Sequence, residues 1–379
     1  MKTALLSALT AAALLAACDD KKPAADAPAA SAAPAASQAT GAPVASGATA
    51  AKEAAKPVAL DPAQLAVFAA VPAKIEAPAN PITDDKVALG KTLYFENRLS
   101  KNQDLSCNSC HDLAKYGVDN EKTSKGHKGQ LGDRNSPTTF HAAGHIKQFW
   151  DGREATIEDQ ALKPVQNPVE MALKDEKAIE TVLRSIPGYA PIFKKAFPDD
   201  KEPVTAANAA KAIGAFERTL VTPSRFDKFL GGEATALTEE EKAGLAKFLD
   251  VGCATCHQGK FVGGSQFEKL GKAKPWTGKT DDVGHMKVTK DEAEKLVFKV
   301  PSLRNIEKTA PYFHDGSIAT LDEAVKLMAR HQLGKELSDG DVKSIVTFLK
   351  SLTGDLPKDR IAKPELPPSG PKTPKPDPT

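Results

Sequence analysis

The sequence predicts an all-α protein. Several stretches place apolar residues at the spacing of an α-helix, while the period-two alternation of Val and Ile that indicates β-strands is scarce. Two short cysteine–histidine motifs indicate where the cores form. At 379 residues the chain has room for one or two cores, so we expect one core around each motif.

Helices are predicted at five places along the chain. Apolar residues recur at helical spacing in Asp84–Phe95, Asp175–Ile186 and Asp341–Leu352. Two capping boxes, Thr238–Glu241 and Thr320–Glu323, each predict the start of a further helix. The second of these helices carries a methionine that becomes important below.

The two motifs have the form C-x-x-C-H. They consist of Cys107, Cys110 and His111, and of Cys253, Cys256 and His257. Two thiols at this spacing can add to the two vinyl groups of one porphyrin, and the following histidine can then bind the iron. A zinc site, a redox dithiol or a disulfide would each explain two cysteines, but none requires the histidine twice. The motifs therefore predict two covalently bound haem c groups and two cytochrome c-like domains.

The N-terminus carries the features of an exported lipoprotein. After Lys2, the apolar run Ala4–Ala17 is too short to span a bilayer and is typical of a signal peptide, here residues 1–17. Cys18 ends a Leu-Ala-Ala-Cys sequence that resembles a bacterial lipobox; an ordinary signal with an incidental cysteine is the alternative. Acylation of Cys18 would anchor a periplasmic protein to a membrane.

Composition sets the remaining boundaries. Residues 18–57 are rich in Ala and Pro and are expected to form a disordered tether. We assign 58–222 to a first haem domain, 223–355 to a second, and 356–379 to a proline-rich tail, of which 363–379 is expected to be disordered. The net charge of +2 gives no indication of nucleic-acid binding.

The chemistry of each haem depends on its sixth iron ligand, which the residues alone leave open. For the first haem, His127 lies between two glycines in a loop suited to release, whereas His141 and His145 could equally be hydrogen-bonded spectators. For the second haem, Met328 lies on the apolar face of its helix and Met286 lies in a polar loop. A methionine ligand would make that haem an electron-transfer centre, but spacing does not decide between the two.

Further motifs give the chain a specific resemblance. They run in order over residues 82–352 and comprise Leu105–Asp112, Arg134–Pro137, Gln148–Arg153, Asn167–Met171, Pro301–Asn305 and Thr309–Gly316. In this combination the chain resembles the bacterial dihaem cytochrome c peroxidases. The N-terminal lipobox and the long tether depart from the family pattern.

The resemblance implies roles for individual residues. His127 matches the distal ligand of a low-potential, peroxidatic haem, and Met328 matches that of a high-potential haem. Trp150 matches a tryptophan between the haems, and Gln160 and Glu170 match the pair that surrounds bound peroxide. A further set, Asn135, Thr309 and Pro311, matches an interdomain calcium site, and His314 matches a histidine near the high-potential haem.

The implied reaction is the reduction of hydrogen peroxide to water. Electrons would come from a small monohaem cytochrome c or a cupredoxin, enter at the high-potential haem and pass to the peroxidatic haem; the family also implies a homodimer. A related enzyme that modifies tryptophans of a partner protein has a tyrosine at the position of Met328. The methionine in this chain therefore argues against that activity. The alternative from another class is a membrane-anchored dihaem electron-transfer cytochrome without catalysis, which would need neither Glu170 nor a releasable His127.

Overall fold

The computed structural model describes residues 57–279 and 281–379. The expected signal peptide, the lipobox at Cys18 and nearly all of the expected tether lie outside the described residues. Residues 54–379 form one compact unit. Within the described part, no helix combines the length and the apolar composition needed to cross a membrane.

The described residues are mainly helical. In the first part of the chain the α-helices are α1 (Pro62–Leu65), α2 (Asp84–Tyr94), α3 (Cys107–Cys110), α4 (Ile157–Ala161), α5 (Lys163–Gln166), α6 (Glu176–Ser185), α7 (Tyr189–Ala196) and α8 (Ala206–Glu217). In the second part they are α9 (Arg225–Leu230), α10 (Glu239–Val251), α11 (Met286–Thr289), α12 (Leu321–Leu333), α13 (Asp339–Lys350) and α14 (Lys358–Ile361).

The helices expected from the sequence are confirmed. α2, α6, α10, α12 and α13 fall on the five predicted stretches. The capping box of Thr238 with Glu241 is present at the start of α10. Thr320 also caps its helix, because its side chain accepts a hydrogen bond from the Glu323 N–H.

In the described part of the chain, sheet structure is limited to one short antiparallel pair. β1 (Phe267–Lys269) pairs with β2 (Val297–Lys299), with Phe267 opposite Lys299 and Lys269 opposite Val297. The prediction of an all-α protein thus holds apart from this ribbon. The ribbon matters for the site because the backbone N–H of Lys299 donates to the Trp150 carbonyl oxygen at 2.9 Å.

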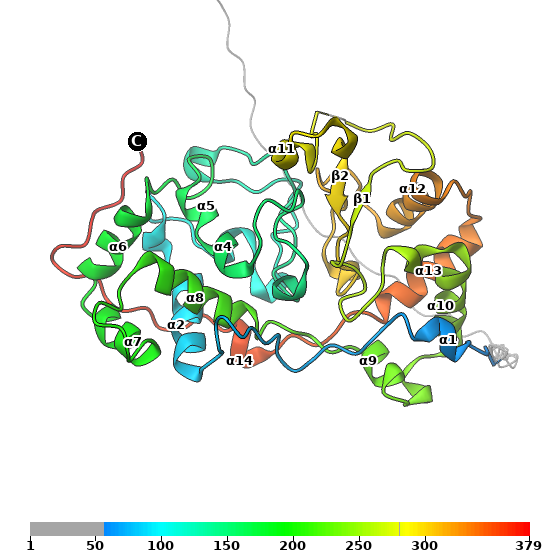
Figure 1. Ribbon diagram of the computed structural model, residues 1–379, viewed down its shortest axis with the longest axis horizontal. Helices are drawn as coiled ribbons and strands as arrows, with labels where there is room; N and C mark the ends of the chain where they lie inside the picture. Colours follow the sequence, from blue (N-terminus) through cyan, green and yellow to red (C-terminus); the bar gives the residue numbers. More distant parts are fainter. Residues whose placement is uncertain (1–56, 280) are drawn as a thin grey trace, which may run out of the picture. The chain divides into compact units, whose positions relative to one another are not determined.

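The helices gather in two groups (Figure 1). In the first group α2 packs on α8, with α4, α6 and α7 around them. Its buried core includes Leu89, Leu93, Ile179 and Phe193. In the second group α10 packs on α13, next to α12, around a separate cluster of buried apolar residues.

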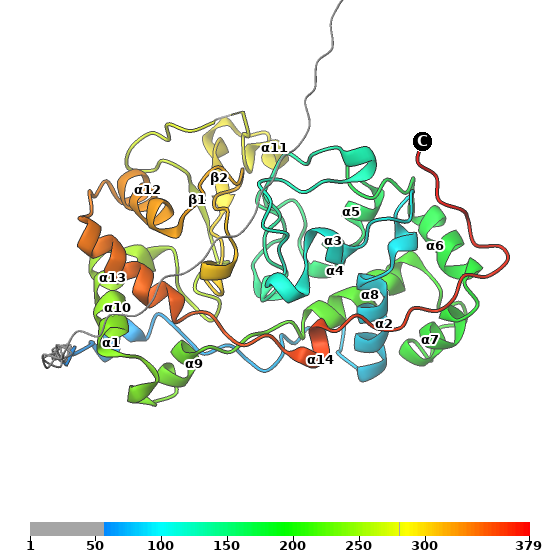
Figure 2. The same cartoon turned by 180° about the vertical axis from the view of Figure 1, so that it is seen from behind.

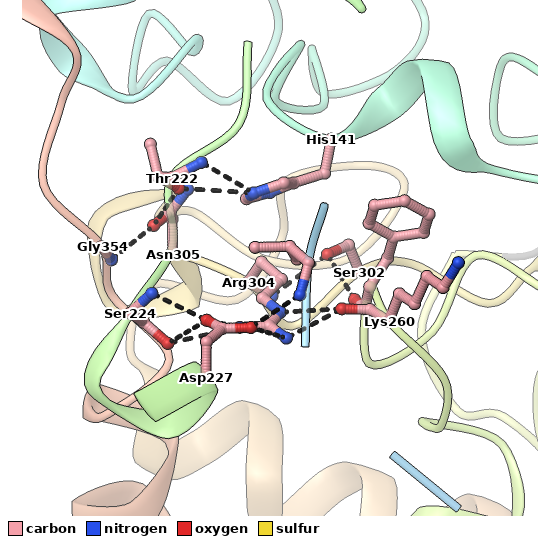
Figure 3. A network of polar contacts seen from close by, with 11 residues as sticks. His141, Thr222, Ser224, Asp227, Lys260, Ser302, Arg304, Asn305 and Gly354 are labelled. Atoms are coloured by element: carbon pink, nitrogen blue, oxygen red, sulfur yellow. Dashed lines mark hydrogen bonds and ion pairs between the residues drawn. The ribbon is translucent and has the colours of Figure 1, made fainter. Parts of the chain in front are cut away.

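A buried polar network lies at the linker between α8 and α9 (Figure 3). Arg304 donates to both carboxylate oxygens of Asp227, at 2.5 and 2.9 Å. The Thr222 N–H donates to His141 Nε2 at 3.0 Å, and the Asn305 Nδ2 donates to Thr222 Oγ1 at 2.9 Å. The network thus joins the linker to segments far away in the sequence, near the boundary that we expected at 222/223.

The C-terminal segment differs from the expectation of disorder. After α14 it runs back along the first group of helices (Figure 2). Arg98 donates to the Pro367 carbonyl oxygen at 2.8 Å and to Ser369 Oγ at 3.0 Å, and the Asp377 N–H donates to the Lys101 carbonyl oxygen at 3.0 Å. Proline narrows the conformations of the free chain, so fewer contacts are needed to hold this segment in place.

Candidate active site

The first C-x-x-C-H motif begins with a helical turn. α3 covers Cys107–Cys110, and the Ser106 N–H donates to Ser109 Oγ at 3.0 Å. His111 follows, with its Nδ1 3.3 Å from the Gly117 carbonyl oxygen. An imidazole that donates from Nδ1 to a carbonyl keeps Nε2 available for a metal.

The second motif follows directly on α10. Gly252 ends the helix with φ of 97°, a left-handed conformation that turns the chain into the 3-10 turn Cys253–Thr255. The His257 N–H then donates to the Cys253 carbonyl oxygen at 3.0 Å. Each motif thus forms its own compact turn, which holds its two cysteines and its histidine close together.

Burial keeps the groups of both motifs neutral. It raises the pKa of Cys107 to about 12, of Cys110 to about 11 and of Cys253 to about 12. It lowers the pKa of His257 to about 4, and it also lowers the pKa of His111. Neutral imidazole is the form that binds a metal.

Both motifs line one cavity of about 920 Å³. Its walls include Cys107, Cys110, His111, Cys253, Cys256, His257 and Met328. Each motif therefore presents two thiols and an imidazole to the same large cavity. This donor set fits two covalently held haem groups.

His127 lies in a turn that is fixed to a neighbouring loop. Its side chain is buried, with 6% exposed, and its Nε2 has no hydrogen-bond partner in the described part of the chain. Its backbone N–H donates to the Glu170 carbonyl oxygen at 2.7 Å. Gly126 permits this approach, because a Cβ there would lie 2.0 Å from the Val169 carbonyl oxygen. A buried imidazole nitrogen without a partner fits a metal ligand.

The other two candidate histidines have different surroundings. His141 is fully buried, and its Nε2 accepts the Thr222 N–H in the linker network. His145 Nδ1 lies 3.3 Å from Lys299 Nζ, while its Nε2 has no partner among the described residues. The bond to Thr222 engages His141 Nε2, whereas His127 and His145 each keep a buried Nε2 without a partner among the described residues. Of these two residues, His145 lines the cavity and His127 does not.

Glu170 and Gln160 both line the cavity. The Glu170 carboxylate accepts a hydrogen bond from Asn167 Nδ2 at 2.9 Å. Burial raises the pKa of Glu170, while the positive charge of Arg153 and the Asn167 bond oppose the rise. Gln160 lies in α4, whose start is fixed by the capping box of Thr156 with Asp159. Both residues of the predicted pair thus line the cavity.

Trp150 lines the same cavity and is fixed at two points. Its indole N–H donates to the Asn135 carbonyl oxygen at 2.9 Å. Its own carbonyl oxygen accepts the Lys299 N–H at 2.9 Å. The ring is therefore held between the 135 segment and β2.

The three residues of the expected calcium site also line the cavity: Asn135, Thr309 and Pro311. Asn135 Nδ2 donates to the Glu121 carbonyl oxygen at 3.0 Å, and the Asn135 N–H donates to the His314 carbonyl oxygen at 2.8 Å. No cluster of three or more His, Cys, Asp or Glu side chains with metal-binding geometry occurs in residues 57–279 and 281–379. A cation here would depend on amide and carbonyl oxygens, which suit a hard ion such as calcium.

The cavity distinguishes the two candidate methionines. Met328 lines it from α12, together with Leu321 and Val325. Met286 begins α11 and is not part of the lining. The fold of α12 over the second motif thus favours Met328, a choice that spacing alone left open.

Two buried residues of the cavity wall escaped the sequence analysis: Lys299 and Glu217. For Glu217 a signal existed, because it is the one acidic residue in the apolar stretch Ala206–Glu217. Lys299 carries no such signal, and nothing in the sequence indicates that it lies beside His145. Their proximity depends on the pairing of segments more than 150 positions apart.

Comparison with known proteins gives a consistent result. Residues 84–235 match a family model described as di-haem cytochrome c peroxidase. The cytochrome c551 peroxidase of Nitrosomonas europaea is 48% identical over 305 residues, which cover 80% of this chain and 89% of that protein. The cytochrome c551 peroxidase of Pseudomonas aeruginosa is 44% identical over 316 residues, which cover 82% of this chain and 90% of that protein.

A solved structure agrees with the fold. It is described as a MauG-like protein associated with microbial copper homeostasis, and it is 29% identical to this chain. The TM-score is 0.69, and the match covers 78% of this chain and 97% of that one. The described architecture therefore extends to a solved structure of more distant sequence.

Proposed function

Because the chain belongs to the di-haem cytochrome c peroxidase family and is a peroxidase of that class, we propose that it reduces hydrogen peroxide at the first motif with electrons received at the second. The overall reaction consumes one peroxide, two electrons and two protons and yields two waters. When bound, the two haems supply redox-active iron for one-electron steps and, at the first motif, a site where peroxide can bind. The remaining steps depend on side chains of this chain.

The observation that carries the proposal is the wall formed by Glu170 and Gln160 next to the turn of His127. The His127 N–H binds the Glu170 carbonyl oxygen, and Glu170 and Gln160 both line the cavity. An electron-transfer cytochrome without catalysis would need no carboxyl group there. Burial raises the pKa of Glu170, which suits this carboxyl group to accept and return a proton.

We assign the following roles. His111 and His257 would hold the two irons, with His127 and Met328 as further donors. Release of His127 on activation would let peroxide enter, and Gln160 would hold the peroxide by hydrogen bonding. Glu170 takes the proton from the near peroxide oxygen and delivers it to the far one, which departs as water.

Trp150 and the calcium residues join the two halves of the site. The indole N–H of Trp150 binds the carbonyl oxygen of Asn135, so a cation on Asn135, Thr309 and Pro311 would stiffen the same segment that holds the indole. We propose that electrons pass through this region from the second motif to the first. The domains 58–222 and 223–355 would then each hold one haem.

The cellular setting is proposed from the sequence. The electron donor is a small monohaem cytochrome c or a cupredoxin, and the enzyme acts in the periplasm. Acylation at Cys18 would attach it to a membrane, and the catalytic part would form a homodimer.

The test is peroxide turnover with a reduced monohaem cytochrome c as donor. Glu170→Gln should lower kcat by about 10²–10⁴-fold, because it removes the proton relay and keeps the size of the side chain. Glu176→Gln, an exposed residue in the first turn of α6, is the matched control and should retain full turnover. Haem content and both reduction potentials should be unchanged in the two variants.

Two results would count against the proposal. Full turnover in Glu170→Gln would remove this carboxyl group from the mechanism. A wild-type protein that exchanges electrons with the donor but consumes no peroxide, either oxidised or half-reduced, would favour the non-catalytic cytochrome instead.

A further inference from the structure

Lys299 is a buried cation without a counter-ion. It ends β2, its exposed fraction is 8%, and it lines the cavity. Its Nζ donates to the Lys147 carbonyl oxygen at 2.9 Å and approaches His145 Nδ1 at 3.3 Å. No carboxylate lies within ion-pair distance of it in residues 57–279 and 281–379. Burial lowers the pKa of Lys299 to about 7, and the more distant charge of Asp151 opposes this fall. Such a group is costly to bury unless an anion joins it.

His145 adds a second donor without an acceptor. An ammonium group can only donate, so His145 Nδ1 accepts from the charged lysine and the neutral imidazole carries its proton on Nε2. This Nε2 is buried, has no partner among the described residues and belongs to a ring on the cavity wall. The pair Lys299 and His145 thus offers a positive charge and an N–H group to whatever fills the cavity.

The surroundings connect this pair to the second motif. Lys299 lies two positions before Pro301, and the Pro301 carbonyl oxygen faces the His257 ring and partly offsets the fall in its pKa. The His145 ring packs against Gly264, whose N–H donates to the Val300 carbonyl oxygen at 2.9 Å. Lys299 therefore belongs to the segment that contacts His257, and His145 packs against a residue bonded to that segment.

We propose that Lys299 and His145 bind a carboxylate of the haem held at the second motif, namely one of its propionates. The inference deepens the proposed function, on which it rests only for the presence of the two haems. A fixed positive charge beside the propionate stabilises the reduced, less positive form of that haem. This charge would thereby help the haem at the second motif to accept an electron from the donor. The backbone N–H of Lys299 is also bonded to the Trp150 carbonyl oxygen.

The test is a spectroelectrochemical titration of both haems in the full-length protein. Lys299→Met should shift the midpoint potential of the second haem downward and leave that of the first much less changed. Lys299→Arg keeps the charge and should stay near the wild-type value. Lys295→Met, which removes an exposed lysine near the start of β2, should have no effect. His145→Ala should give a smaller downward shift of the same haem, and it provides the readout if Lys299→Met fails to take up haem.

Several outcomes would overturn the proposal. One is that both potentials are unchanged in a fully haem-loaded Lys299→Met protein. A shift confined to the first haem would assign the carboxylate to the other cofactor, and an equal shift in Lys299→Arg would indicate a packing effect. Potentials that follow added phosphate or chloride would indicate a free anion. None of these readouts uses peroxide. The measured potentials therefore test this proposal even if the turnover test of the proposed function fails.

Discussion

Glu217 ends α8 and carries a carboxyl group that is buried beside the first motif. Its exposed fraction is 4%, it lines the cavity, and its Oε2 has no partner among the described residues. Burial raises the pKa of Glu217 to about 8; the charge of Glu158 adds to this rise and Arg218 opposes it. At this site the protein favours a neutral carboxylic acid near neutral pH.

The raised pKa of Glu217 predicts a pH-dependent loss of stability. In the unfolded chain the pKa is near the ordinary 4.5, so the folded state is favoured fully below that pH and loses stability as the pH rises through about 8. Glu217→Gln should remove this contribution, a difference on the order of 3 kcal/mol between about pH 5 and about pH 8. Urea unfolding of the two proteins at both pH values measures it. Glu233→Gln, an exposed control, should follow the wild type, and parallel curves for wild type and Glu217→Gln would contradict the prediction.

At the scale of elements, the turn of His127 and the loop 167–171 act as a pair. The His127 N–H donates to the Glu170 carbonyl oxygen, and Gln130 Nε2 donates to the His127 and Pro168 carbonyl oxygens at 3.0 and 3.3 Å. The proposed ligand and the proposed proton carrier are thus connected through backbone bonds. Release of His127 would have to break or shift this contact.

Gly126→Ala should therefore loosen His127. The new Cβ would meet the Val169 carbonyl oxygen at 2.0 Å, so the turn must move away from the loop, at a cost of about 1–3 kcal/mol. We expect the first haem to be high-spin in the oxidised variant with calcium added. In the wild type, the proposed release of His127 would make this haem high-spin only on half-reduction. Visible and EPR spectra of both states measure this.

The control for this prediction lies in the same region. A Cβ at Gly132 would meet only the Arg134 carbonyl oxygen, at 3.9 Å, so Gly132→Ala should keep the wild-type spectra. If oxidised Gly126→Ala is low-spin like the wild type, the turn does not hold the ligand in the way proposed.

At the scale of the whole described unit, the C-terminal segment ties the second group of helices back to the first. Leu356 and Ile361 pack against the cluster that contains Tyr94 and Phe216. Farther along, the Asp377 N–H binds the Lys101 carbonyl oxygen, and the Lys101 N–H binds the Met171 carbonyl oxygen at 2.8 Å. Lys101 thus connects the end of this segment, through backbone hydrogen bonds, to the loop that contains Glu170.

Truncation should reveal how much this segment stabilises the protein. Removal of all residues after Ala362 should lower the free energy of unfolding by about 2–4 kcal/mol, because several buried or half-buried hydrogen bonds are lost. Removal of residues after Ser369 keeps both bonds to Arg98 and should cost less. Urea unfolding of the three haem-loaded proteins measures the order of their free energies of unfolding. A chain ending at Ala362 that is as stable as the full chain would contradict the prediction.

The sequence by itself determined those features whose chemistry is local. Two thiols and a histidine in five consecutive positions specify haem attachment wherever the segment lies, because the bonds form within one turn. Helix starts such as Thr238 are local for the same reason, since the cap is three residues from its partner. Family motifs supplied Glu170 and Gln160, whose position on the cavity wall no spacing could have indicated.

The tertiary structure decided what depends on distant segments. It placed Met328 rather than Met286 on the cavity wall, engaged His141 in the linker network, and ordered a proline-rich tail by contacts with Arg98. It also brought Lys299 to His145 across more than 150 positions. Composition indicates the conformational entropy and the polarity of a segment. Whether a buried charge finds a partner, or a tail becomes ordered, depends on the groups that folding places beside it.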